Sequence, residues 1–236
     1  MPFLYYSPDS LWTYVLFVLP AVLIAMWASA NVNSTFKKYS SIPSASGYTG
    51  ADAARRILDA NGLFSIRIER VSGNLTDHYD PKAGVIRLSD SVYDNRSAAA
   101  IGVAAHEAGH AVQHATGYSP LVIRNAIIPI CQIGSNLAMP LVLLGLVLDM
   151  FGLCFIGIVA FGLSTLFQLI TLPVEFNASS RALAALESSG RFSADDLGNA
   201  KKTLRAAALT YMAALAVALA NLLRLIVMVG GRRRRD

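Results

Sequence analysis

Four long runs of apolar residues alternate with polar segments along the chain. The runs cover residues 11–30, 126–148, 151–172 and 206–229, and a helix needs roughly 20 such residues to cross a hydrocarbon core about 30 Å thick. No basic segment precedes the first run, and it is longer than the apolar part of a cleavable signal, so we expect an uncleaved anchor. The pattern predicts a mainly α-helical, polytopic membrane protein with about four transmembrane helices.

A segment of ordinary polar composition, residues 32–125, separates the first two runs and is long enough to fold on the membrane surface. Thr49 and Asp52 form a capping-box pattern, and the helix that follows is expected to end at Asn61-Gly62. An alanine-rich stretch without proline, residues 97–116, predicts a second helix. We therefore expect a small α+β unit on one membrane face.

Two short stretches between these helices have the pattern of β-strands. Residues 64–68 alternate apolar and polar side chains, and Val85 to Leu88 form another run after a turn-rich segment. We expect the two stretches to pair as a β-hairpin. The second stretch is then a hypothetical edge on which a substrate peptide adds as a further strand.

The part of the chain after the third run is predicted to be helical. Pro173 is expected to open a helix, because proline is favoured at the first helical position. Ser193 and Asp196 form a further capping box, for a helix that continues into the last run. The predicted division is a transmembrane helix at 11–30, the surface unit at 32–125 with its second helix at 97–116, a transmembrane hairpin at 126–172, a helix and connector at 173–205, a fourth transmembrane helix at 206–229 and a basic tail at 230–236.

Composition supports a membrane protein and argues against a nucleic-acid partner. The 236 residues are 54% hydrophobic and have a mean hydropathy of +0.48, which is more apolar than a soluble domain of this size requires. The net charge of +5 owes much to the consecutive arginines at 232–235. Arginines that flank a membrane helix are common, so this run indicates a lipid boundary and no nucleic acid.

The predicted helix at 97–116 carries the strongest chemical signal in the chain. His106-Glu107-Ala108-Gly109-His110 is a His-Glu-x-x-His pattern, in which the two histidines lie one helical turn apart on the same face. Imidazoles at this spacing can converge on one zinc ion. The glutamate between them is the expected general base of a metallopeptidase. We predict one Zn²⁺ per chain, held in part by His106 and His110.

A catalytic zinc needs a third protein ligand, and Glu175 is the best candidate. The metzincin pattern is excluded because Gln113 and Thr116 occupy the positions of its glycine and third histidine. The second and third runs form a hairpin, so the motif helix and the residues after the third run emerge on the same membrane face. Asp149 is the rival ligand, as in site-2-type intramembrane proteases, but it falls in the turn of that hairpin, near the opposite face. Glu175 therefore meets the histidines more readily.

The expected reaction is hydrolysis of a peptide bond. Zinc lowers the pKa of its bound water towards about 7, and Glu107 takes the water proton and delivers it to the leaving amine. Tyr211 and His78 are candidate donors to the tetrahedral oxyanion. A non-catalytic zinc-binding membrane scaffold is an alternative, although such a structural site has no need of Glu107.

Four segments together resemble the YugP-type membrane zinc peptidases of bacteria. This resemblance implies a gluzincin-like site, distantly similar to those of HtpX and the CAAX prenyl proteases, in which a glutamate on a downstream helix completes the zinc shell. Glu175 matches that role. In HtpX-like proteins an aspartate one turn after this glutamate supports a ligand histidine. This chain has Ser179 at that position, so the supporting role is not carried over to it. The segments that carry the resemblance are 75–81, 101–110, 172–182 and 208–211.

Basic residues near the apolar runs give the expected orientation. Lysines and arginines favour the cytoplasmic side of a membrane helix. The arginine run at 232–235 favours a cytoplasmic location for the membrane face opposite the site. The number of lysines and arginines near the apolar runs is slightly higher on the site face, so we expect a cytoplasmic site in a bacterial plasma membrane. The expected partners are the lipid bilayer and a protein or peptide substrate, including membrane proteins. The basic residues on the site face are Lys37, Lys38, Lys201, Lys202 and Arg205.

Overall fold

The computed structural model describes residues 8–233, with the side chains of 11–230. The end of the predicted basic tail, residues 234–236, lies outside the described residues. The chain divides into two compact units. The apolar unit comprises Met1–Ala28, Ile123–Leu172 and Thr210–Asp236, and the mixed unit comprises Ser29–Val122 and Pro173–Leu209.

Within the described residues, four helical stretches are long and apolar enough to span a membrane, as the sequence predicts. Each is longer than the run from which it was predicted. They are Leu11–Ser40, Ser119–Val147, Phe151–Ser188 and Ala194–Gly230. The helices that form them are α1 (Pro8–Thr13), the π-helical turn η1 (Tyr14–Val18), α2 (Leu19–Ser40), α5 (Ser119–Val147), α6 (Phe151–Ser188) and α7 (Ala194–Arg233).

Helix α6 continues through Pro173, so the prediction that a new helix opens there is wrong. Proline removes one backbone hydrogen bond, but helices of membrane proteins tolerate it, and α5 likewise contains Pro129 and Pro140. As a result, Glu175 lies in the interior of a long helix. Its carboxylate is therefore not explained as a charge at a helix N-terminus.

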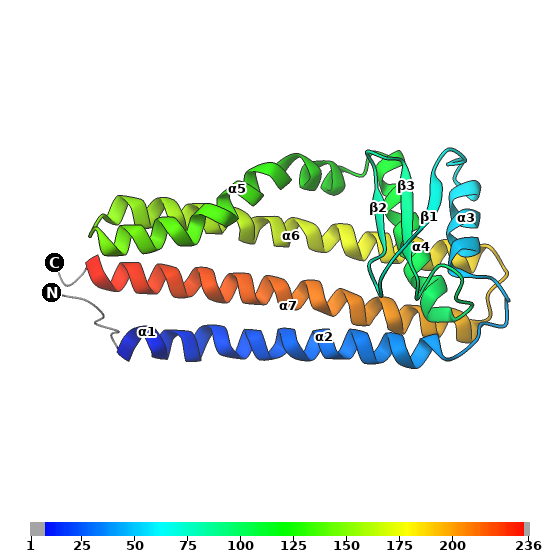
Figure 1. The fold of residues 1–236 in the computed structure, drawn as a ribbon, viewed down its shortest axis with the longest axis horizontal. Helices are drawn as coiled ribbons and strands as arrows, with labels where there is room; N and C mark the ends of the chain where they lie inside the picture. The colour runs from blue at the N-terminus through cyan, green and yellow to red at the C-terminus, as the bar shows by residue number, and fades with distance from the viewer. Residues whose placement is uncertain (1–7, 234–236) are drawn as a thin grey trace. The chain divides into compact units, whose positions relative to one another are not determined.

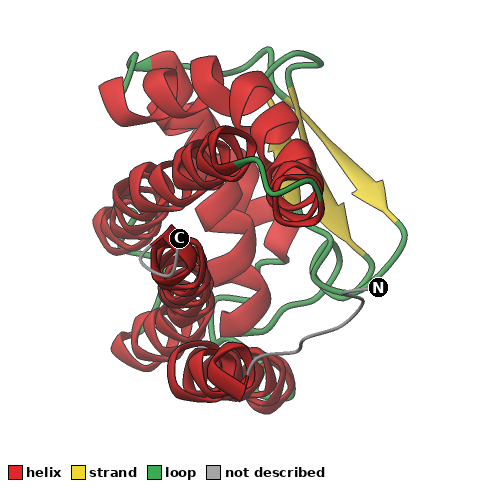
Figure 2. Ribbon diagram, turned by 90° about the vertical axis from the view of Figure 1, so that its left-hand side faces the viewer, coloured by secondary structure: helices red, strands yellow, loops and turns green. Residues whose placement is uncertain are grey.

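The mixed unit contains a three-stranded sheet packed against two helices. Its elements are α3 (Gly50–Ala60), β1 (Arg67–Val71), β2 (His78–Asp80), β3 (Val85–Ser89) and α4 (Ala98–Ala115). Strand β3 lies between β1 and β2 (Figure 1). The sheet packs on α4, and β1 also contacts α3; Figure 2 shows the strands in yellow beside red helices.

The predicted hairpin between residues 64–68 and 85–88 is wrong. β1 and β3 are parallel neighbours, and the true hairpin joins β3 to the antiparallel strand β2. Phe64 is 72% exposed and precedes the first strand. Because β3 is paired on both sides, it is not an edge on which a peptide could add. The missed strand, β2, is three residues long and has no alternating pattern.

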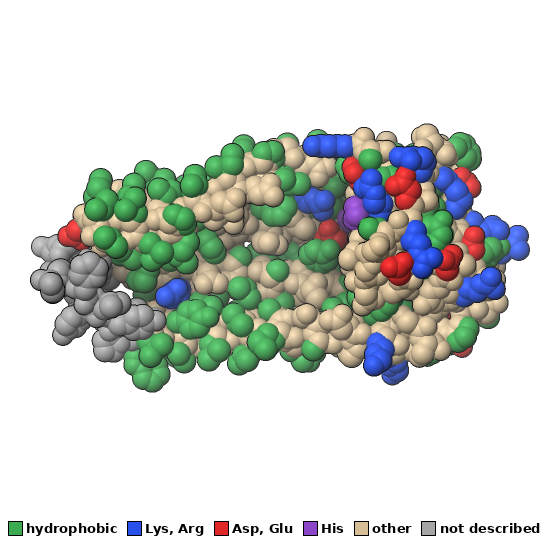
Figure 3. Space-filling view, viewed as in Figure 1, with side chains coloured by type: hydrophobic (Ala, Val, Ile, Leu, Met, Phe, Trp, Pro, Cys, Tyr) green, Lys and Arg blue, Asp and Glu red, His purple; other side chains and the backbone are tan. Residues whose placement is uncertain are grey.

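Small residues bring the helices of the mixed unit close together. The inward face of α4 is almost entirely alanine, and it packs with Leu58 of α3, Ile86 of β3, Leu186 of α6 and Leu204 of α7 in one core. Gly109 marks the closest approach, since a Cβ there would lie 2.6 Å from the carbonyl oxygen of Ala178 on α6. The face of the unit seen in Figure 3 is charged over the sheet and α3.

Capping fixes where the helices of this unit begin, as the sequence predicts. The capping box of Thr49 and Asp52 opens α3, and Ser193 with Asp196 opens α7 through the same reciprocal bonds. Ser97 caps α4, which ends before Gly117 at a φ of +63°. These signals use neighbouring residues only, so they could be read directly from the sequence.

Candidate metal centre

Two histidines of α4 and one glutamate of α6 converge on a single point in the mixed unit. The ligand atoms of His106, His110 and Glu175 all lie within 4.8 Å of one another. Glu175 Oε2 is 3.2 Å from His106 Nε2 and 3.5 Å from His110 Nε2. Among the described residues, no other such group of three histidine, cysteine or acidic side chains was found. Two imidazole nitrogens and a carboxylate oxygen are a donor set suited to zinc.

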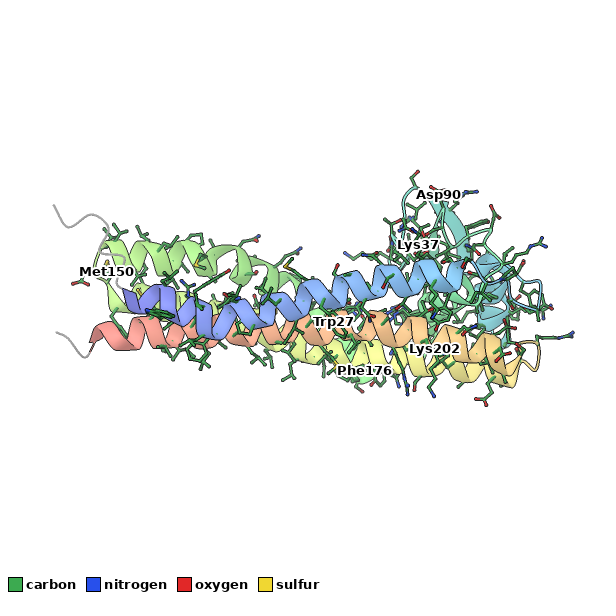
Figure 4. All side chains as sticks on the ribbon, turned by 90° about the horizontal axis from the view of Figure 1, so that it is seen from below. Trp27, Lys37, Asp90, Met150, Phe176 and Lys202 are labelled. Atoms are coloured by element: carbon green, nitrogen blue, oxygen red, sulfur yellow. The ribbon has the colours of Figure 1, made fainter. Side chains whose placement is uncertain are left out.

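The helices place these side chains by their spacing and by their close contact. The rings of His106 and His110 are 4.7 Å apart between centroids, as expected one turn apart on α4. Ala178, which Gly109 allows to approach, is three residues after Glu175 and therefore lies near it on α6. Phe176, the next residue along, is 44% exposed and points outward (Figure 4), whereas Glu175 is only 5% exposed.

Glu107 is buried beside the histidines and is 8% exposed. Its charge acts on two neighbours. Burial raises the pKa of Asp77 and Glu107 raises it further, against hydrogen bonds from Ser89 that lower it. Burial opposes protonation of His110, but the hydrogen bond to Glu175 and the charges of Glu107 and Glu175 hold the pKa of His110 above its usual value.

The outward nitrogen of each histidine has a hydrogen-bond partner that sequence reasoning missed. His106 Nδ1 lies 3.0 Å from Ser179 Oγ, and His110 Nδ1 lies 3.0 Å from Gln113 Oε1. Both contacts leave the Nε2 atoms facing Glu175, which is the arrangement that metal-binding histidines need. Only their spacing in the sequence could have pointed to these two partners, since Ser179 follows Glu175 by one helical turn and Gln113 follows His110 by three residues.

The two candidate oxyanion donors lie on β2 and α7. His78 is in β2, where its Nδ1 lies 2.9 Å from the carbonyl oxygen of Thr76 and its Nε2 lies 3.5 Å from Arg87. Tyr211 is in α7, within the apolar unit. Their roles stay predictions.

Two further side chains are explained without a metal. Asp149 is not a member of the three-residue group. It sits in the turn between α5 and α6 with a φ of +54°, a left-handed conformation that aspartate tolerates. His114, one turn beyond His110, lies 3.2 Å through Nδ1 from the hydroxyl of Tyr79 and so links α4 to β2.

Comparisons with known proteins identify the family of this chain. Residues 14–230 match the family model described as "Putative neutral zinc metallopeptidase". The chain is 47% identical over 220 residues to "Putative membrane protease YugP" of Bacillus subtilis strain 168, covering 93% of this chain and 98% of the relative. No solved structure matches the chain significantly. The chain therefore belongs to the family of "putative neutral zinc metallopeptidases".

Proposed function

We propose that the protein is a membrane-bound zinc endopeptidase that holds one zinc ion per chain with His106, His110 and Glu175. The observation that carries the proposal is the convergence of two partly buried histidines of α4 and the buried Glu175 of α6. The outward hydrogen bonds of both imidazoles support it, because they orient Nε2 of each ring towards the third donor. The glutamate on a separate helix supports a gluzincin-like arrangement.

Bound zinc would supply Lewis acidity to the scissile carbonyl and to the attacking water. Glu107 then acts as the general base, takes a proton from that water and returns it to the leaving amine. Its position next to His106 on α4, and its burial, suit this role. Tyr211 and His78 remain the proposed donors to the oxyanion.

The experiment that tests catalysis is the change Glu107→Gln in the purified full-length protein. We expect zinc content to stay at one ion per chain while peptide hydrolysis falls by about 10²- to 10⁴-fold, as for the loss of a general base. Zinc is measured by elemental analysis and hydrolysis with a quenched fluorescent peptide. A zinc-binding scaffold has no catalytic rate to lose, so it would behave identically before and after this change.

The substrate is proposed to be a protein or peptide that reaches the site at the lipid boundary, membrane proteins included. The four long apolar helices support a multi-pass protein of the bacterial plasma membrane. Basic side chains on the site face, among them Lys37 of α2 and Lys202 of α7 (Figure 4), support a cytoplasmic site. The domain limits given from the sequence, except for the helix start at Pro173, are kept as part of this proposal.

A further inference from the structure

A line of hydrogen bonds leads away from His110 through side chains that take no part in binding metal. Gln113 is fully buried on α4. Its Nε2 donates to the carbonyl oxygen of Val174 at 2.8 Å and to Oδ1 of Asn177 at 2.9 Å. Its Oε1 lies 3.0 Å from His110 Nδ1. Both polar atoms of the buried Gln113 side chain therefore have hydrogen-bond partners, one for Oε1 and two for Nε2.

The orientation of the Gln113 amide follows from the chemistry of its partners. A backbone carbonyl can only accept a hydrogen bond, so the amide nitrogen must face Val174 and the amide oxygen must face His110. An amide oxygen also only accepts. His110 Nδ1 must therefore carry a proton, and in the neutral ring the lone pair is left on Nε2, where a metal can bind.

The next residue along the line is fixed in the same way. Oδ1 of Asn177 accepts from Gln113 Nε2 and also from Arg181 Nε at 2.8 Å. Arginine has donors only, so Asn177 must present its oxygen on this side. Arg181 is in turn held over the ring of Tyr118, 5.8 Å from its centroid. Every bond from Arg181 to His110 thus has one permitted direction.

We propose that Arg181, Asn177 and Gln113 are positioning residues that act in series to keep His110 in its metal-binding tautomer and orientation. The inference rests on the proposed function only in taking the site to bind zinc. Val174, Asn177 and Arg181 recur at helical spacing on α6, beside the stripe that holds Glu175 and Ser179. One helix therefore carries both a ligand and the support for a ligand of the neighbouring helix.

Metal titration of the full-length protein tests this series, with Co²⁺ used for its visible spectrum and Zn²⁺ measured by competition with a chelating dye. We expect Gln113→Met to weaken binding of both ions by about 10- to 100-fold, as when an outer partner of a ligand histidine is lost. Asn177→Leu is expected to act in the same direction. Asn177→Asp keeps the accepting oxygen, and we expect it to retain the wild-type cobalt spectrum and an affinity within about threefold.

Coupling separates a series from a general loss of packing. If Asn177 acts through Gln113, then Asn177→Leu changes affinity by less than about twofold once Gln113→Met is present. Additive losses would overturn the series. Arg181→Met tests the outer end of the series, where the side chain is only half-buried and its loss puts folding less at risk. We expect it to weaken metal binding severalfold. Arg191→Met is the control for the loss of an exposed charge.

Wild-type affinity and cobalt spectra in both Gln113→Met and Arg181→Met would overturn the inference. Metal binding is the readout, so a wild-type protein that binds zinc but hydrolyses no peptide refutes the proposed function and leaves the series open to these same titrations. A wild-type protein that takes up neither ion refutes both.

Discussion

Ser179 Oγ lies 3.0 Å from Nδ1 of His106, on the side of the ring opposite Glu175. The resemblance to HtpX-like proteins implies no role for this position, because a serine stands where they have an aspartate. A hydroxyl and a carboxylate can both accept from an imidazole N–H. The serine therefore offers His106 a weaker, uncharged acceptor than a carboxylate would be.

We predict that Ser179→Ala weakens zinc binding by about tenfold, because His106 loses the acceptor that orients its ring. Ser179→Asp is expected to bind zinc at least as tightly as the wild type, since a carboxylate makes His106 a stronger ligand. Competition with a chelating dye measures both affinities. Unchanged affinity in Ser179→Ala would show that this contact does not support the ligand.

Gly109 is predicted to be intolerant of even a methyl group. A Cβ at this position would lie 2.6 Å from the backbone oxygen of Ala178, so Gly109→Ala must push α6 away from α4. We expect overpacking to cost about 1–3 kcal/mol of unfolding free energy and zinc binding to weaken, because Glu175 moves with α6. The control is Gly198→Ala, where a Cβ meets no atom within 4 Å. Equal zinc affinity in the two variants would contradict this reading of the motif.

The pH dependence of stability is predicted to differ between the metal-free and zinc-bound protein. The pKa of His110 is raised in the folded metal-free chain, so its charged form stabilises the fold below the ordinary histidine pKa of about 6.5. That contribution is lost as pH rises through the raised pKa. Zinc competes with the same proton, so its stabilisation grows over this range. Thermal unfolding from pH 6 to 9 should show a stability that falls as pH rises in the presence of chelator, and no such fall in the zinc-bound protein.

The orientation is predicted to place the C-terminus outside the cytoplasm. With four spans, the segment between the first and second spans and the end of the fourth span lie on opposite membrane faces. If the site is cytoplasmic, an alkaline phosphatase fused after residue 236 is active and a fluorescent protein fused there is dark. The reverse pattern would move the site to the outer face and change the class of substrate.

Much of the fold could be predicted because its signals are local. The four apolar helices, the helix of the His-Glu-x-x-His motif and both capping boxes depend on residues within a few positions of one another. The parallel pairing of β1 with β3 could not be predicted, because the strand that completes the sheet, His78–Asp80, is short and polar. Pro173 misled for a physical reason, since a membrane helix absorbs a proline that would end many soluble ones.

The site itself divides in the same way. His106, Glu107 and His110 are predicted from one motif, and Glu175 is predicted from the topology of the apolar runs. The hydrogen bonds that support the histidines join α4 to α6, and Ser179 is 73 residues from His106. Gln113 is close in sequence to His110, but its proposed role in orienting His110 depends on a hydrogen bond to Asn177, which is 64 residues away. Such partners become visible only once the helices are placed side by side.

The central claim is that Glu175 completes the metal site, and the most direct measurement is zinc content with peptide hydrolysis in Glu175→Ala. Glu187→Ala is the matched control, because Glu187 is an exposed glutamate of the same helix. The account predicts one zinc per chain and full activity in the wild type and in Glu187→Ala, and loss of both in Glu175→Ala. Stoichiometric zinc and normal cleavage in Glu175→Ala would contradict it.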